Sequence, residues 1–172
     1  MDIKSKIRVI EDYPQEGISF KDITTLLKDK KAYKETLDLM AEKLNQLDFD
    51  YIIGIESRGF IFGAALADRL NVGFIPVRKP GKLPGEIKSI SYDLEYGQSK
   101  IEIHEDSLNK GDKVVIVDDL IATGGSAKAC ASLVESIGGE VVCLEFLIEL
   151  TDLKGRDELK DYEVISLIEY DH

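Results

Sequence analysis

The stretch VVIVDDLIATGGS, residues Val114–Ser126, carries the pattern from which we infer the fold. Its first four residues are β-branched and apolar, which is typical of a strand buried on both faces of a parallel sheet. We predict that this strand ends at Asp118 and that a helix follows from about Ser126 to Ser136. A strand that leads through a short loop into a helix is the repeating unit of an α/β fold.

The same alternation continues on both sides of this stretch. Apolar residues at helical spacing predict an amphipathic helix over Lys31–Gln46 and a second helix from about Gly59 to Leu70. The fold class is therefore α/β, a mostly parallel twisted sheet flanked by helices, and ligands are expected at the carboxyl ends of the strands. Short apolar runs predict three further strands, at Tyr51–Glu56, Gly73–Val77 and Val141–Glu149.

The length of 172 residues predicts a single domain, residues 1–172. The segment Asp12–Asp22 precedes the sheet and is expected to fold over its edge, as part of a small N-terminal hood of about residues 1–30. The alternation breaks down at about residues 79–100, where Pro and Gly are frequent. This segment is predicted to be a long mobile loop or hairpin that acts as a lid.

The charge, the hydropathy pattern and the cysteines exclude several classes of function and location. A formal net charge of -11, with no cluster of Lys and Arg, argues against nucleic acid as a partner. Neither an apolar leader nor a stretch long enough to span a bilayer is apparent, so we expect no membrane partner and a cytoplasmic location. Cys130 and Cys143 lack metal-binding or redox spacing and are predicted to be reduced core thiols.

The loop after Asp118 has the composition of a phosphate site. Glycines at 124 and 125 allow backbone N–H groups to approach an anion, and the N-terminus of the following helix adds its partial positive charge. Two adjacent carboxylates would repel a phosphate alone, but they can accept hydrogen bonds from the hydroxyls of a sugar. We therefore predict a ribose 5-phosphate site, in preference to an ordinary strand followed by a Gly-rich turn. Its predicted residues are Asp118, Asp119, Ala122, Thr123, Gly124, Gly125 and Ser126.

The run VVIVDDLIATGGSAKA resembles the phosphoribosyl pyrophosphate motif of the type I phosphoribosyltransferases, and DDLIATGGS resembles the form found in the adenine branch. The resemblance implies transfer of a phosphoribosyl group from phosphoribosyl pyrophosphate to N9 of adenine, giving AMP and pyrophosphate, as in purine salvage. It also implies a homodimer and Mg²⁺ held mainly by substrate oxygens, with Asp118 or Asp119 as the carboxylates able to assist. Further matching segments follow in the same order along the chain: GISFKDIT, IESRGFIFG, VRKPGKLPGE, YDLEYG and IELTDLKGR.

The same resemblance implies roles for residues outside the ribose 5-phosphate site. Basic side chains and backbone N–H groups would meet the leaving pyrophosphate. Taken singly, Arg78, Lys79 and Lys82 are equally consistent with solvated surface groups, and Arg58 without the accompanying motifs would more often be an exposed surface residue. The residues matched to this role are Glu56, Ser57, Arg58, Arg78, Lys79 and Lys82.

Catalytic and base-binding residues are implied in the same way. Glu95, Tyr96 and Arg58 match the catalytic positions, and Glu95 would share the N9 proton or stabilise the cationic sugar when the lid closes. A surface carboxylate is the alternative for Glu95. Adenine would bind at Ser19, Phe20 and Lys21, with Phe20 on the ring face, although a phenylalanine taken alone is more often a core residue.

Two other functions remain open from the sequence. The sugar-phosphate motif is shared with enzymes that act on xanthine, guanine, hypoxanthine or orotate. A regulator that senses phosphoribosyl pyrophosphate is the alternative from another class, but it would need a nucleic-acid surface, which the acidic charge disfavours.

Overall fold

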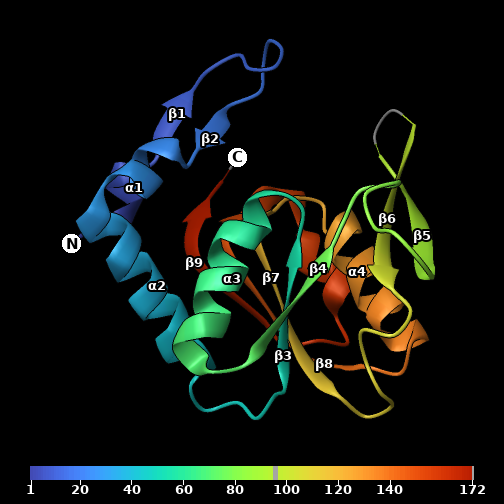
Figure 1. The fold of residues 1–172 in the computed structure, drawn as a ribbon. Coiled ribbons are helices and arrows are strands. Elements are labelled where there is room, and N and C mark those ends of the chain that lie inside the picture. The colour runs from blue at the N-terminus through green and yellow to red at the C-terminus, as the bar shows by residue number, and fades with distance from the viewer. Residues whose placement is uncertain (95–96, 172) are drawn as a thin grey trace.

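The computed structural model describes residues 1–94 and 97–171, and in these residues the central sheet has five parallel strands in the order β4-β3-β7-β8-β9 (Figure 1). The predicted α/β class and parallel sheet are confirmed. Strand β9 is not predicted from the sequence. It lies at the edge of the sheet and is mostly half-buried, so its segment VISLIEY lacks the continuous apolar run that marks the central strands. The strands are β3 (Tyr51–Ile55), β4 (Gly73–Val77), β7 (Lys113–Ile121), β8 (Glu140–Leu150) and β9 (Val164–Tyr170).

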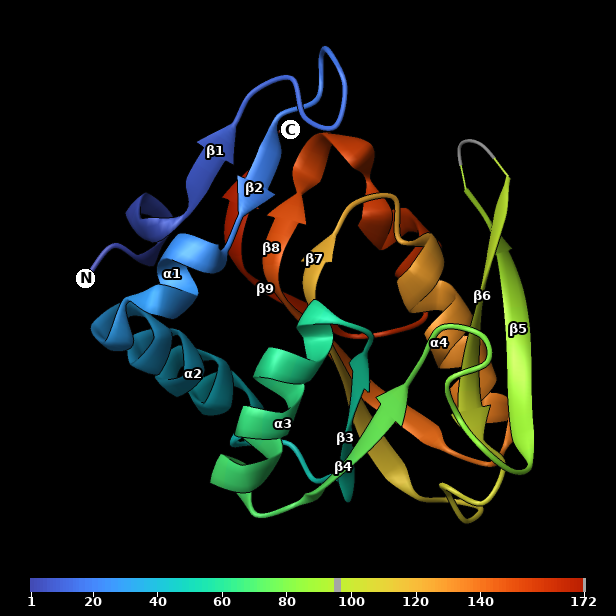
Figure 2. The same ribbon diagram turned by 45° about the horizontal axis from the view of Figure 1, so that its top comes forward.

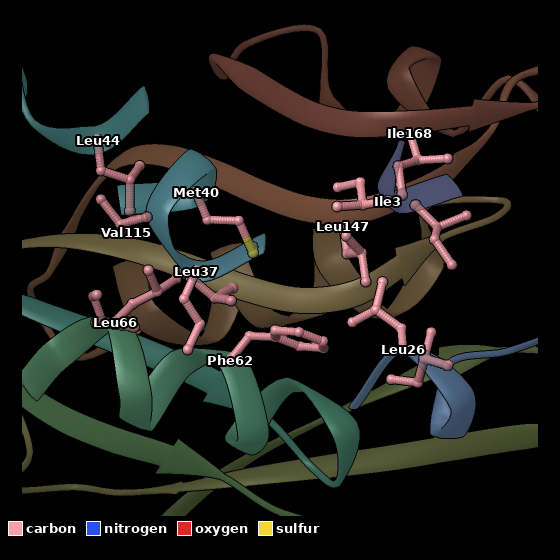
Figure 3. Close-up of a cluster of buried hydrophobic side chains, with 14 of the residues drawn as sticks. Ile3, Leu26, Leu37, Met40, Leu44, Phe62, Leu66, Val115, Leu147 and Ile168 are labelled. Carbon is pink, nitrogen blue, oxygen red and sulfur yellow. The ribbon is translucent and has the colours of Figure 1, made fainter. Parts of the chain in front are cut away.

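Helices cover both faces of this sheet. Helices α2 (Lys30–Leu44) and α3 (Arg58–Leu70) lie on one face, and α4 (Gly125–Ser136) lies on the other. All three helices are close to their predicted bounds. The core beneath α2 and α3 is formed by aliphatic and aromatic side chains from both layers (Figure 3), among them Leu37, Met40, Phe62, Leu66, Val115 and Leu147.

Strand β7 extends further than the sequence predicts. It does not end at Asp118 but continues to Ile121, because Leu120 and Ile121 pair with Ile148 and Glu149 of β8. The side chain of Ile121 is also buried in the core, which stabilises the extension. Both carboxylates therefore lie within a strand, and only residues 122–124 separate β7 from α4.

The hood and the hairpin flank the carboxyl ends of the strands. The N-terminal segment forms a 3-10 helix (Ile3–Lys6), β1 (Arg8–Ile10), β2 (Phe20–Asp22) and α1 (Thr24–Lys28). The predicted loop or hairpin is an antiparallel hairpin of β5 (Ile87–Asp93) and β6 (Gln98–His104), which extends four residues beyond the predicted end at about residue 100. Figure 2 shows the hood and the hairpin on opposite sides of that sheet edge. The mobility of the hairpin stays a prediction.

Two short 3-10 helices, Thr151–Leu153 and Gly155–Leu159, connect β8 to β9. Within the described residues, we find no helix with the length and apolar character required to cross a membrane.

Candidate functional site

The junction between β7 and α4 forms a cradle suited to an anion. Gly124 has φ +89°, in the left-handed region that favours glycine, and α4 begins directly after it. The first backbone N–H groups of α4 have no partners within the helix, so they are available to a phosphate. A pocket of about 320 Å³ opens here. It is lined by all seven predicted ribose 5-phosphate residues, together with Arg58 and residues from the hairpin.

The two carboxylates of this pocket differ in their surroundings. Asp119 is buried, and its Oδ2 accepts a hydrogen bond of 2.6 Å from Arg58 Nε. The charge of Asp119 raises the pKa of Arg58. Burial, and then the negative charge of Asp119, raise the pKa of Asp118 well above its ordinary value. The site is therefore less negative than two independent carboxylates would make it, which lowers the repulsion of an incoming phosphate.

The start of α3 is held against β7 at Gly59. A Cβ atom added to Gly59 would lie 2.9 Å from Asp118 Oδ1 and 2.9 Å from the backbone oxygen of Val117. Glycine at this position therefore permits the close approach that places Arg58, the first residue of α3, on Asp119.

The predicted pyrophosphate residues gather around Glu56, at the end of β3. The Glu56 side chain is 9% exposed, and its Oε1 accepts hydrogen bonds from Arg78 Nε and the backbone N of Lys79, both at 3.1 Å. Its Oε2 accepts one from Lys82 Nζ at 2.6 Å. The Glu56 carboxylate thus holds the basic residues in place instead of presenting a free group to an anion.

The region around Glu56 is continuous with the phosphate cradle. A second pocket, also of about 320 Å³, is lined by Glu56, Ser57, Arg58, Lys79, Asp118 and Asp119. Three of these residues, Arg58, Asp118 and Asp119, also line the first pocket. The two pockets therefore meet at the aspartate pair, which suits a sugar that carries a phosphate at one end and a diphosphate at the other.

Sequence reasoning missed the contribution of Tyr92, Asp93 and Leu94, which line the first pocket from the hairpin. Lys79 Nζ donates a hydrogen bond of 3.3 Å to Tyr92 Oη. The motif YDLEYG begins at Tyr92 and so includes these residues, but the resemblance assigns roles only to Glu95 and Tyr96. Those two lie outside the described residues, so their catalytic roles stay predictions.

The predicted base-binding residues lie in or next to β2 of the hood. Lys21 is 8% exposed and donates hydrogen bonds to the backbone oxygen and Oγ of Ser19, at 3.1 and 2.7 Å. Its ammonium group also lies 4.9 Å from the ring centroid of Tyr170. Phe20 packs edge-to-face against Tyr13. These three residues are not among those that line the two pockets, and their role in binding a base stays a prediction.

Substitution of Glu56 by Gln is expected to change stability in a pH-dependent way. Burial alone would raise the pKa of Glu56, but hydrogen bonds from Lys82, Lys79 and Arg78 outweigh it and lower the pKa to about 2. Because the folded-state pKa is depressed, the stabilisation is present above the ordinary value of 4.5 and is lost as the pH falls toward 2. In urea denaturation, Glu56→Gln should be less stable than wild type at pH 7, and the difference should shrink as the pH falls below 4.5. A difference that is constant with pH would contradict this assignment.

Comparison with known proteins agrees with this geometry. The family model described as "Phosphoribosyl transferase domain" matches residues 22–172. A protein of Clostridium botulinum named adenine phosphoribosyltransferase is 60% identical over 171 residues, covering 99% of both chains.

Solved structures give the same assignment. The adenine phosphoribosyltransferase of Thermoanaerobacter pseudethanolicus has a TM-score of 0.96 at 55% identity and covers 98% of both chains. That of Saccharomyces cerevisiae, solved with adenine and an imino-altritol bisphosphate, has a TM-score of 0.91 at 40% identity and covers 96% of both chains. The family model matches most of the chain, and the relatives named here are 40–60% identical over nearly its whole length. The protein therefore belongs to the phosphoribosyltransferase family, in its adenine phosphoribosyltransferase group.

Proposed function

We propose that the protein transfers the 5-phosphoribosyl group of phosphoribosyl pyrophosphate to N9 of adenine, producing AMP and pyrophosphate for purine salvage. The observation that carries this proposal is the continuity of the two pockets through Arg58, Asp118 and Asp119. One pocket has the donors for a phosphate, and the other has basic residues for a diphosphate. The base is supported by relatives named adenine phosphoribosyltransferase, one of which was solved with adenine bound.

Each part of the substrate has a matching group. The 5-phosphate fits the N-terminus of α4 at Gly125 and Ser126, and the ribose hydroxyls fit the carboxylates of Asp118 and Asp119. The diphosphate fits beside Ser57, Arg58 and Lys79. Negative charge develops on the leaving pyrophosphate during bond cleavage, so cationic side chains positioned beforehand stabilise the transition state.

Arg58 can serve Asp119 and the diphosphate together. Its Nε donates to Asp119 Oδ2, which uses one of the five guanidinium N–H groups. The Asp119 carboxylate can therefore accept the ribose hydroxyls as well, and the remaining N–H groups of Arg58 are available to the diphosphate. The half-exposed side chain of Arg58 leaves room for the diphosphate beside it.

Magnesium is the proposed cofactor. The only protein ligands that we propose for it are the carboxylate oxygens of Asp118 and Asp119, which suit a hard cation that retains much of its water. When bound, Mg²⁺ neutralises charge on the diphosphate. A homodimer, as implied by resemblance, and a cytoplasmic location are likewise proposals, and light scattering of the purified protein tests the first.

The substrate is tested by measuring pyrophosphate release with adenine, hypoxanthine, guanine and xanthine in turn. Adenine should be preferred by about 10⁴-fold or more, because a base site with matched hydrogen bonds rejects an analogue that leaves buried polar groups unpaired. Asp118→Asn/Asp119→Asn serves as the inactive control. A preference for a 6-oxopurine would assign another base. Binding of phosphoribosyl pyrophosphate without turnover of any base would favour the sensing regulator.

Replacement of Glu95 by Gln is expected to lower kcat far more than it weakens binding of either substrate. The carboxylate is proposed to accept the N9 proton or stabilise the cationic sugar, and both effects arise in the transition state. Steady-state kinetics with both substrates checks this. Glu105→Gln, which removes an exposed carboxylate directly after β6 that pairs with Lys88, is the matched control. An unchanged kcat for Glu95→Gln would reject the catalytic role.

A further inference from the structure

The 3-10 helix Gly155–Leu159 lies directly against the outside of the phosphate cradle. A Cβ atom added to Gly124 would lie 2.6 Å from the backbone oxygen of Gly155. In the reverse direction, a Cβ added to Gly155 would lie 2.6 Å from the backbone oxygen of Ala122. The backbones of the two segments therefore touch at a point where neither has room for a side chain.

An ion pair fixes this 3-10 helix to the sheet. Arg156 Nε donates to Oε1 and Oε2 of Glu149 at 3.0 and 2.9 Å, and Arg156 Nη1 donates to the backbone oxygen of Val164 at 2.9 Å. Glu149 is 6% exposed and also accepts a hydrogen bond of 2.7 Å from Ser166 Oγ. Arg156 thus joins its own helix to both β8 and β9.

The anchored position is adjacent to the cradle in the sheet as well. Glu149 pairs with Ile121, the last residue of β7, immediately before the three-residue loop. The far end of the 3-10 helix is fixed by Leu159, which is buried in the core on the α4 side. The loop of residues 122–124 is therefore supported in two places. Pairing of β7 with β8 fixes the strand that leads into the loop, and the 3-10 helix packs against the loop at Gly155.

We propose that Gly155 and Arg156 are positioning residues for the phosphate loop, holding residues 122–124 so that the N–H groups at the start of α4 face the 5-phosphate. This inference rests on the proposed function and deepens it. A displacement of about 1 Å in such a cradle lowers reaction efficiency strongly, because the substrate is then bound in the wrong geometry.

The test compares Arg156→Ala, Arg156→Lys and Gly155→Ala with wild type, measuring KM for each substrate, kcat and the melting temperature. Arg156→Ala and Gly155→Ala should raise KM for phosphoribosyl pyrophosphate by about tenfold or more, with KM for adenine within about twofold of wild type. Arg156→Lys should recover only part of the loss, because Lys lacks the planar fork that spans Glu149 and Val164.

Arg69→Ala is the matched control, since it removes an ion pair with Asp38 that joins α3 to α2. It should lower the melting temperature with KM for phosphoribosyl pyrophosphate unchanged. The same behaviour in Arg156→Ala and Gly155→Ala would overturn the proposal, because it would show a role in stability alone. If Arg156→Ala does not fold, Arg156→Lys takes its place: a raised KM for phosphoribosyl pyrophosphate would support the proposal, and an unchanged KM would overturn it.

Failure of the proposed function would be visible separately, as wild-type protein that forms no AMP. In that case calorimetric titration with ribose 5-phosphate replaces KM. Weaker binding by Arg156→Ala than by Arg69→Ala would still support positioning of the loop, and equal binding would overturn it.

Discussion

Replacement of Gly124 by Ala is expected to lower kcat/KM for phosphoribosyl pyrophosphate by about a hundredfold or more, because the loop that faces the 5-phosphate would be displaced. Two effects combine at this position. A non-glycine residue at φ +89° has an energetic cost of roughly 1–2 kcal/mol. The new Cβ would also lie 2.6 Å from the backbone oxygen of Gly155. Because a Cβ is fixed rigidly to its own backbone, this contact is relieved only by moving the loop or the 3-10 helix.

Gly111→Ala is the control for the general cost of a non-glycine residue at positive φ. Gly111 has φ +88°, nearly the same as Gly124, but a Cβ added there meets nothing within 4 Å. It precedes β7, whereas the site lies at the other end of that strand. We expect Gly111→Ala to lower stability by roughly 1–2 kcal/mol and to retain kcat/KM. Steady-state kinetics and urea denaturation are measured for both variants. Equal losses of activity would attribute the effect of Gly124→Ala to general destabilisation and would contradict displacement of the phosphate loop.

Features that depend on local sequence could be predicted. The apolar run Gly73–Val77 coincides with β4, and the glycines of the loop mark the start of α4. Strand β7 was predicted too short because adjacent carboxylates usually indicate the end of a buried strand. Here Asp119 tolerates burial because Arg58 pairs with it, a contact that depends on where α3 packs.

Features that depend on tertiary contacts could not be predicted. The sequence indicates that Arg78, Lys79 and Lys82 are basic, but their common attachment to Glu56 arises only when β3 and β4 lie side by side. The close approach of Gly155 to Gly124 likewise requires β8 to pair with β7. Neither arrangement has a spacing that would identify it along the chain.

Replacement of Glu145 by Leu is expected to stabilise the protein by up to about 3 kcal/mol at pH 7. Glu145 is fully buried in β8, and neither of its carboxyl oxygens has a hydrogen-bond partner in the described structure. Alternation along the strand places it on the same sheet face as Leu147, which points into the core beneath α2 (Figure 3). Burial raises the pKa of Glu145 to about 9, although the charge of Lys43 acts in the opposite direction.

The sign of the pH dependence follows from this raised pKa. The unfolded chain has an ordinary carboxyl with a pKa of 4.5, so folding above that pH requires Glu145 to take up a proton. The associated stability is complete below pH 4.5 and is lost progressively as the pH rises toward 9. Each pH unit in this range lowers the free energy of unfolding by about 1.4 kcal/mol at most. Because pH 7 lies about 2.5 units above the unfolded pKa of 4.5, the total at pH 7 is about 3 kcal/mol. Leu avoids this proton uptake and is close to Glu in size.

Urea denaturation between pH 5 and pH 9 tests this explanation. The advantage of Glu145→Leu over wild type should grow with pH, whereas Glu140→Leu, at the exposed start of the same strand, should stay within about 0.5 kcal/mol of wild type. Glu145→Gln should also lose the pH dependence but keep a buried polar group without a partner, and so gain less than Leu. A Leu advantage that is equal at pH 5 and pH 9 would attribute the effect to packing. The increase with pH is therefore the observation that assigns it to the buried carboxyl.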